Sequence, residues 1–184
     1  MKRSVLVLLD FSKAYDTVWR QKLMMTLLKK GVSEKLVRWI FKFLENHQAK
    51  VLLNGEESRS RKLHQGLPQG SVLSPLLFLF YINDLAERLP KPDQAQLSKE
   101  EFAALFADDV SALATANTKE EAQEKAQKIV DIVVWWSKKW KLQLNADKCE
   151  VSFFSNWTQE AGFKPKIYIN GKCIKFNPTR CFWV

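Results

Sequence analysis

Two adjacent carboxylates interrupt a small and apolar stretch, ALFADDVSALA at residues 104–114, and this arrangement most restricts how the chain can fold. Ala103–Phe106 and Ser111–Ala114 are short apolar arms on either side of Asp108 and Asp109. Such arms predict a tight β-hairpin with both acids at its tip. Two carboxylates about 4 Å apart repel by roughly 4 kcal/mol at an effective dielectric constant near 20. The pair therefore indicates a bound cation or a shared proton, although most Asp-Asp pairs in turns are simply solvated.

A third acid, Asp10, directly follows the apolar run Ser4–Leu9 (SVLVLL). A continuous run of this kind predicts a strand that is buried on both faces. If this strand lies beside the hairpin, three carboxylates converge. They could then hold two divalent ions about 4 Å apart, the arrangement that activates a 3′-hydroxyl and stabilises a departing pyrophosphate.

Four segments have the apolar spacing and the end signals of helices. We expect them at 17–30 between an Asp16 N-cap and Gly31, from the Ser33 N-cap to about Asn46, from Ser74-Pro75 to about Arg88, and from the Thr118/Glu121 capping box to Trp140. The apolar face expected for the last of these helices is made by Ala122, Ala126, Ile129, Val130, Val133, Trp136 and Trp140.

Extended segments lie between and after these helices. A β-hairpin or a loop is expected at 48–65 with Asn54-Gly55 at its turn, and strands are expected at Val151–Phe154, Lys166–Ile169 and Lys172–Phe176. The order lacks the regular βαβ alternation of a doubly wound sheet. It favours an α+β fold with an antiparallel sheet backed by helices.

The chain is basic, with 29 Lys and Arg against 20 Asp and Glu, a formal net charge of +9. This balance suits a polyanionic partner such as nucleic acid, and it also suits a basic protein without such a partner. Arg59, Arg61 and Lys62 concentrate charge on the return arm of the 48–65 hairpin. This arm either faces a phosphate backbone or is a solvated hairpin.

Cysteine usage and hydropathy predict an intracellular protein, in the nucleus or the cytoplasm, that is neither secreted nor in a membrane. Cys149, Cys173 and Cys181 form neither a zinc-binding pair nor a disulfide framework. The longest apolar stretch, Leu76–Ile82, is far shorter than the roughly 20 residues of a membrane span. We find no signal peptide.

Four stretches of the chain resemble sequence motifs of one protein family, in the order in which that family has them. LLDFSKAYDTV (8–18), HQGLPQGSVLSPLLFLFYINDL (64–85), LFADDVSAL (105–113) and WKLQLNADKCEVSFFS (140–155) resemble motifs A, B, C and D of reverse transcriptases, in particular those of non-LTR (LINE-type) retrotransposons. The resemblance implies a single palm unit over 1–184 with partial fingers elements at 19–63. It also implies a truncated primer-grip region at 176–184.

This resemblance implies an RNA-directed DNA polymerase that adds dNTPs to a DNA primer on an RNA template, with two Mg²⁺ ions or with Mn²⁺. Asp10 and Asp108 are the implied principal metal ligands, with Asp109 beside them and the Phe11 carbonyl as a further oxygen ligand. Lys148 matches the lysine that protonates the departing pyrophosphate, and a plain surface lysine is the alternative for it.

The same resemblance assigns dNTP contacts to two motifs. Tyr15 stands where the family places an aromatic gate against a ribose 2′-hydroxyl, with a core aromatic at a helix start as the alternative. Gln69 would contact the incoming nucleotide or the templating pair, and Gly70 would let the backbone approach closely. The implied dNTP-binding residues are Phe11, Ser12, Lys13, Ala14, Tyr15, Gln69 and Gly70.

We expect the upstream fingers segment, the thumb and the endonuclease of the parent polyprotein to lie outside these 184 residues. Activity of this segment alone therefore stays open. A catalytically silent, nucleic-acid-binding remnant of such an element is the alternative function. An RNA-directed RNA polymerase palm also uses an Asp-Asp hairpin, but Tyr15 and the Ala107 that precedes the pair argue against it.

Overall fold

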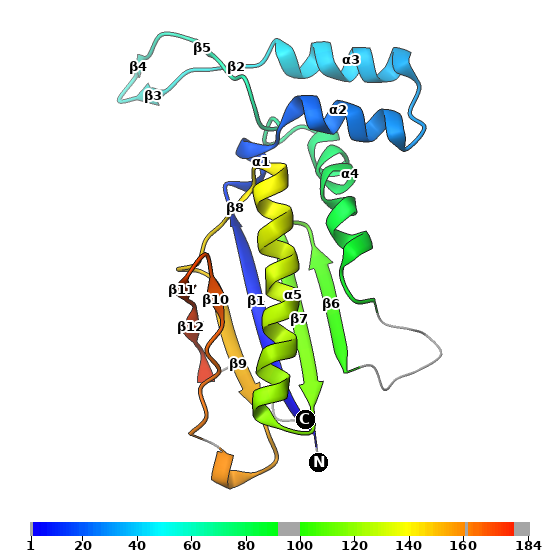
Figure 1. The fold of residues 1–184 in the computed structure, drawn as a ribbon. Helices are drawn as coiled ribbons and strands as arrows, with labels where there is room; N and C mark the ends of the chain where they lie inside the picture. Colours follow the sequence, from blue (N-terminus) through cyan, green and yellow to red (C-terminus); the bar gives the residue numbers. More distant parts are fainter. Residues whose placement is uncertain (1, 92–99, 161, 179–184) are drawn as a thin grey trace. The chain divides into compact units, whose positions relative to one another are not determined.

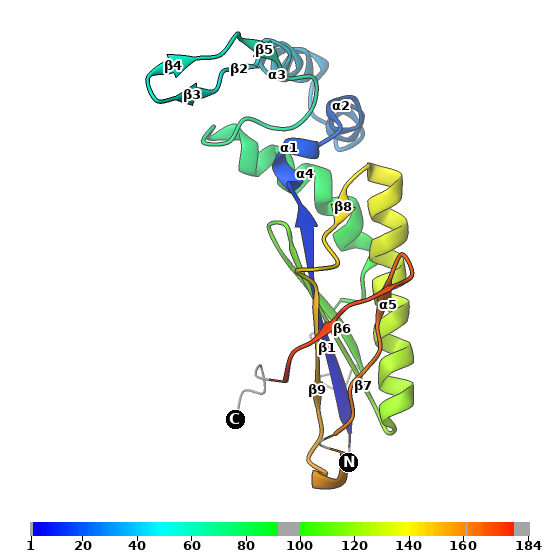
Figure 2. The same cartoon turned by 90° about the vertical axis from the view of Figure 1, so that its left-hand side faces the viewer.

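The computed structural model describes residues 2–91, 100–160 and 162–178, which form two compact units (Figures 1 and 2). Residues up to Ser12 and from Leu85 onward belong to the first unit, and Lys13–Asp84 form the second. Each unit is described by itself. The expectation of one palm unit over 1–184 stays a prediction.

The first unit contains a six-stranded sheet. Its strands are β1 (Arg3–Ser12), β6 (Glu101–Phe106), β7 (Asp109–Ala116), β8 (Gln143–Leu144), β9 (Glu150–Phe154) and β12 (Lys175–Phe176). The order is β12-β9-β1-β7-β6, and β8 pairs with β1 beyond the end of β9. All pairings are antiparallel except that of β12 with β9. The predicted α+β class with an antiparallel sheet is confirmed.

Helix α5 (Lys119–Trp140) lies across one face of this sheet, as the two perpendicular views show (Figures 1 and 2). It begins as predicted, because the Thr118 hydroxyl accepts a hydrogen bond of 3.2 Å from the Glu121 N–H. Every residue of its predicted apolar face is buried. The sequence pattern therefore predicted both the start and the buried face of this helix.

Strand β1 is buried on one face only, so the prediction of burial on both faces is wrong. Val5, Val7 and Leu9 are at most 2% exposed, whereas the residues that alternate with them are partly exposed. Successive strand residues point to opposite faces, and α5 covers only one of them. Asp10 consequently lies on the face opposite α5.

The acidic hairpin has the predicted form. Strands β6 and β7 pair from Glu101 with Ala114 to Phe106 with Asp109. The connection is the two-residue turn Ala107-Asp108. Asp108 therefore occupies the turn, and Asp109 is the first residue of β7.

The predicted strand Val151–Phe154 is confirmed by β9, but the two strands predicted after it are shorter than expected. The chain forms a turn of 3₁₀-helix, η1 (Thr158–Glu160), and then a hairpin of β10 (Tyr168–Ile169) and β11 (Lys172–Cys173). The predicted strand 172–176 is divided at Ile174, because Lys172–Cys173 pair with β10 whereas Lys175–Phe176 pair with β9. The last residues of the predicted primer-grip region, 179–184, lie outside the described residues.

The second unit is mainly helical, with α1 (Ala14–Thr17), α2 (Arg20–Lys29), α3 (Glu34–Glu45) and α4 (Leu73–Arg88), the last of which continues into the first unit. A ribbon of β2 (Gln48–Ala49) with β5 (Arg61–Lys62) and of β3 (Leu52–Leu53) with β4 (Glu56–Glu57) follows α3. The predicted turn of this hairpin is confirmed, since Asn54 and Gly55 have φ values of 52° and 85°.

Two predicted helix starts are wrong. The expected helix 17–30 is divided at Val18 and Trp19, so Asp16 lies inside α1 instead of capping a helix. Tertiary hydrogen bonds cause the break, because the Val18 carbonyl accepts from Gly66 and the Trp19 N–H donates to the Tyr81 hydroxyl.

Helix α4 also begins before the predicted cap. Ser74 lies inside this helix, which begins at Leu73, and its hydroxyl donates to the Pro68 carbonyl. Within the parts of the chain that the structure describes, no helix is long and apolar enough to cross a membrane.

Candidate active site

Asp10 and Asp109 are direct partners in the antiparallel pairing of β1 with β7. Their neighbours Leu9 and Val110 are buried against α5, so both acidic side chains project from the opposite face. Residues paired in this way have Cβ atoms about 4.5–5.5 Å apart. The fold therefore brings together two acids that are 99 positions apart in the sequence.

The environment of Asp109 disfavours its negative charge. Burial raises the pKa of this carboxyl above its ordinary value of 3.8, and the charges of Asp108 and Asp10 raise it further. The positive charge of Lys148 lowers the pKa of Asp109 and so partly offsets these effects. A divalent cation at this position would relieve the repulsion among the three acids.

The turn that carries Asp108 has an unusual backbone. Ala107 has a φ of 54°, in the left-handed region that residues with a Cβ rarely adopt. The acids are thus presented by a hairpin turn that carries local backbone strain.

A hollow of about 340 Å³ lies on the face that carries the two paired acids. Its lining combines three acidic side chains with one lysine and with the strand residues around them. The residues are Leu8, Leu9, Asp10, Asp109, Val110, Ser111, Lys148 and Glu150.

The donor set fits a hard divalent cation, which takes carboxylate oxygens as ligands. Among residues 2–91, 100–160 and 162–178, however, no three His, Cys, Asp or Glu side chains are grouped closely enough to hold a metal ion. Joint coordination would require Asp108 and Asp109 to bring their carboxylates closer to that of Asp10. The predicted metal site therefore stays a prediction, with Asp10 and Asp109 placed side by side by their strands.

Lys148 lies next to Asp10, with its ammonium 4.0 Å from Asp10 Oδ2. Its side chain is 69% exposed, so it has room to reach a ligand on this face. Phe11, predicted to offer its carbonyl to a metal, has a buried ring 6.1 Å from the ring of Trp136. Ser12 pairs with Gln143 of β8.

The loop between β8 and β9 makes hydrogen bonds with the main-chain groups of Asp10, a contact that the sequence did not predict. The Asn145 N–H donates to the Asp10 carbonyl at 2.8 Å, and the Asp10 N–H donates to Cys149 Sγ at 3.4 Å. Cys149 is fully buried, and this burial raises the pKa of its thiol. Main-chain contacts of this kind leave no periodic signal in a sequence, although both residues lie within the stretch that resembles motif D.

In the second unit, Tyr15 stacks on Phe78 with the ring centroids 4.7 Å apart and the planes inclined by 15°. The Tyr15 carbonyl accepts a hydrogen bond of 2.7 Å from the Leu67 N–H. Tyr15 is partly exposed, so the alternative of a core aromatic also stays a prediction. The role of Tyr15 as a sugar gate is not tested by this packing and stays a prediction.

Gln69 is held by a residue that the sequence did not single out for the site. Its side-chain Nε2 donates to Asp16 Oδ1 at 2.9 Å. Gly70 has a φ of +81° and open space at its Cβ position. The approach of a nucleotide to Gly70 stays a prediction. A tight contact within the chain occurs at Gly66, where an added Cβ would lie 2.5 Å from the Asp16 carbonyl oxygen.

Arg20 organises the loop that leads to Gln69, and nothing in the sequence pattern distinguished it from other helical arginines. Its buried guanidinium donates to four main-chain carbonyls at 2.7–3.0 Å, and burial lowers its pKa. The accepting residues are Leu44, Leu63, Gln65 and Gly66. One side chain thereby ties the end of α3 to the 63–66 segment.

The predicted nucleic-acid contacts Arg59, Arg61 and Lys62 are all exposed. Lys62 pairs with Glu45 at 3.6 Å, and it lines a hollow of about 510 Å³ in the second unit together with Lys13. Ala14 is buried. Exposure suits a phosphate contact and a solvated arm equally, so both interpretations remain.

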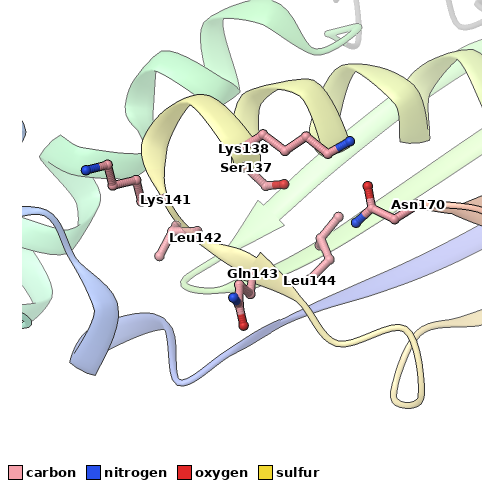
Figure 3. Close-up of a pocket in the computed structure, with 7 residues that line it drawn as sticks. All are labelled: Ser137, Lys138, Lys141, Leu142, Gln143, Leu144 and Asn170. Carbon is pink, nitrogen blue, oxygen red and sulfur yellow. The ribbon is translucent and has the colours of Figure 1, made fainter.

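A separate hollow of about 460 Å³ lies at the end of α5 (Figure 3). Lys138 and Lys141 line it, but their ammonium groups extend away from each other. It contains none of the predicted site residues. The remaining lining residues are Ser137, Leu142, Gln143, Leu144 and Asn170.

Known proteins show what this chain is similar to. It is 29% identical over 167 residues to the RNA-directed DNA polymerase from mobile element jockey of Drosophila melanogaster, covering 91% of this chain and 18% of that protein. It is 30% identical over 166 residues to the polymerase of the same name from Drosophila funebris, covering 90% and 18%. The chain thus spans less than a fifth of the length of these relatives.

Solved structures of telomerase have a similar fold. The apo telomerase of Candida tropicalis, truncated from its C-terminal domain, superposes with a TM-score of 0.60 at 13% identity, over 86% of this chain and 32% of that one. The telomerase of Candida albicans in complex with a TWJ fragment of telomeric RNA gives 0.58 at 14% identity, over 92% and 30%. This likeness concerns the fold alone and is consistent with a palm-like α+β arrangement.

The reverse transcriptase (RNA-dependent DNA polymerase) family matches residues 1–176, nearly the whole chain. This match agrees with the order of the four motifs and with the relatives from non-LTR retrotransposons. The chain therefore belongs to the reverse transcriptase (RNA-dependent DNA polymerase) family.

Proposed function

We propose that this chain is the palm, with part of the fingers, of an RNA-directed DNA polymerase that adds dNTPs to a DNA primer on an RNA template. The observation that carries the proposal is the cross-strand pairing of Asp10 with Asp109, next to Asp108 in the adjoining turn. Carboxylates grouped where neighbouring strands meet can hold the divalent cations that assist phosphoryl transfer.

Asp10 and Asp108 are assigned as the principal metal ligands, with Asp109 and the Phe11 carbonyl beside them. Two Mg²⁺ ions, or Mn²⁺, would activate the primer 3′-hydroxyl and neutralise charge on the departing pyrophosphate. Lys148, whose exposed ammonium lies 4.0 Å from Asp10, is assigned to donate a proton to the pyrophosphate oxygen.

The remaining roles follow from the family resemblance. Tyr15 would exclude a ribose 2′-hydroxyl, and Gln69 with Gly70 would contact the nucleotide or the templating pair. Arg59, Arg61 and Lys62 would contact phosphates of the nucleic acid, as the net charge of +9 favours. Main-chain and side-chain groups of residues 11–14 would complete the dNTP contacts.

The test is primer extension on poly(rA)/oligo(dT) with Mg²⁺ or Mn²⁺. It uses this chain and a chimera in which the flanking segments of the Drosophila melanogaster jockey polymerase are joined to it. Incorporation that Asp108→Ala abolishes and Asp131→Ala preserves supports the proposal. Asp131 is a matched control because it is an exposed aspartate of α5 whose Oδ1 accepts a hydrogen bond of 2.8 Å from Gln127 Nε2.

Three results distinguish the alternatives. Incorporation by the chimera but not by the chain alone means that the reaction needs the flanking segments. A folded chimera without Asp108-dependent incorporation contradicts the proposal and favours the silent nucleic-acid-binding remnant. Incorporation of NTPs in preference to dNTPs would instead indicate an RNA-directed RNA polymerase.

A further inference from the structure

The regular hydrogen-bond ladder of β1 is interrupted beside Asp10. Along the side of β1 that does not pair with β7, β1 pairs with β9 as far as Leu8, opposite Glu150, and with β8 from Phe11, opposite Leu144. Residues 145–149 therefore connect β8 to β9 opposite only two residues of β1, Leu9 and Asp10. No strand partner is available to Asp10 on this side, so its main-chain groups need other partners.

The two ends of the 145–149 loop supply these partners. The Asn145 N–H donates to the Asp10 carbonyl at 2.8 Å, and Cys149 Sγ accepts the Asp10 N–H at 3.4 Å. Cys149 is fully buried, so water cannot replace its sulfur as an acceptor.

The loop itself is a closed turn. The N–H groups of Lys148 and Cys149 both donate to the Asn145 carbonyl, at 2.9 and 3.0 Å, and the Asn145 side chain accepts from the Asp147 N–H at 3.3 Å. The groups that contact Asp10 are thus fixed relative to one another. Lys148, 4.0 Å from the Asp10 carboxylate, belongs to the same turn.

We infer that Cys149 and Asn145 are positioning residues that hold the backbone of Asp10, so that its carboxylate stays on the face shared with Asp109 and next to Lys148. The inference rests on the proposed function, because it gives Asp10 the role of a metal ligand. It adds residues that contact no ligand themselves and act through the main chain of Asp10.

The test compares Cys149→Ala and Cys149→Ser with Cys173→Ala, which removes an exposed thiol from β11. Mn²⁺ binding to the chain is followed by EPR, and exchange of the Asp10 and Val7 amides is followed by NMR without metal. We expect Cys149→Ala to weaken Mn²⁺ binding by about 10-fold, the effect usual for residues that orient a metal ligand. The serine hydroxyl can still accept the Asp10 N–H, so Cys149→Ser should retain most of the affinity. Cys173→Ala should change neither measurement.

The amide exchange separates positioning from general stability. Positioning predicts faster exchange at Asp10 in Cys149→Ala with Val7 unchanged. Equal acceleration at both amides, or unchanged Asp10 exchange and Mn²⁺ affinity in a folded Cys149→Ala protein, overturns the inference. If the unsubstituted chain shows no Asp108-dependent Mn²⁺ binding, the proposed metal site fails, and the inference, which gives Asp10 the role of a metal ligand, falls with it. The Asp10 exchange then reports only whether Cys149 holds the backbone.

Discussion

Asp10 and Asp109 are directly paired on neighbouring antiparallel strands, so two like charges lie side by side on one face of the sheet. Like charges placed directly opposite are destabilising. We predict that Asp109→Asn raises the free energy of unfolding by about 0.3–1 kcal/mol near neutral pH without divalent ions. Urea denaturation in EDTA measures this difference.

The pH dependence of this effect has a definite sign. The folded-state pKa of Asp109 is raised above its ordinary value of 3.8, so the folded chain binds this proton more tightly than the unfolded chain does. The stability that protonation contributes is lost as the pH rises through the raised pKa. The advantage of Asp109→Asn should therefore shrink as the pH falls toward 3.8, and an advantage that is constant with pH contradicts the account.

Gly66→Ala should strongly destabilise the second unit. Gly66 has a φ of +80°, and an added Cβ would lie 2.5 Å from the Asp16 carbonyl oxygen, which is backbone and cannot move aside. Together, the left-handed backbone and the overpacking should cost about 2–4 kcal/mol in thermal or denaturant unfolding. Gly31→Ala is the matched control, because Gly31 has a φ of +84° with nothing within 4 Å. Equal losses for the two variants would show that the contact with Asp16 is unimportant.

Ala107→Gly should stabilise the acidic hairpin slightly. Ala107 has a φ of 54°, which glycine adopts without steric cost. After the greater unfolded-state entropy of glycine is subtracted, a gain of about 0.5 kcal/mol remains. Ala104→Gly, in the adjoining strand β6, should lower stability by about 0.5–1 kcal/mol. The two substitutions are chemically identical, so stability changes of the same sign contradict the prediction.

Asp16→Ala should weaken the use of dNTPs by the chimera. A carboxylate only accepts hydrogen bonds, so Asp16 fixes the NH₂ end of Gln69 toward itself and leaves Gln69 Oε1 to face elsewhere. Loss of this orientation should raise KM for dTTP by about fivefold, equivalent to about 1 kcal/mol, with kcat little changed. Steady-state kinetics with Asp131→Ala as the control measures this, and an unchanged KM rules out the assigned link.

Local patterns predicted the elements whose stability depends on neighbours in sequence. The capping box at Thr118 and the apolar face of α5 are examples, and so are the turn at Asn54-Gly55 and the hairpin that carries Asp108 and Asp109, although Asp109 lies in its strand and not in its turn. Asp10 was identified because it directly follows the apolar run Ser4–Leu9, although β1 continues to Ser12. The partnership of Asp10 with Asp109 was expected only on the condition that the strand lay beside the hairpin.

Contacts between distant main-chain groups could not be predicted in the same way. The break between α1 and α2 depends on two hydrogen bonds to residues about 50–60 positions away: the Val18 carbonyl accepts from Gly66, and the Trp19 N–H donates to Tyr81. Helix periodicity does not encode such contacts. Arg20 and Cys149 likewise act on backbone groups, so their residue types gave no signal. These are tertiary contacts that overrule local preference.

Asp10, Asp108 and Asp109 are proposed to form one divalent-cation site. EPR titration measures Mn²⁺ binding to the unsubstituted chain and to Asp10→Asn, Asp108→Asn and Asp109→Asn, with Asp131→Asn as the control. We expect each of the three substitutions to weaken Mn²⁺ binding by about 10-fold or more and the control to bind like the unsubstituted chain. If all three variants bind Mn²⁺ as tightly as the unsubstituted chain, these acids do not form the site.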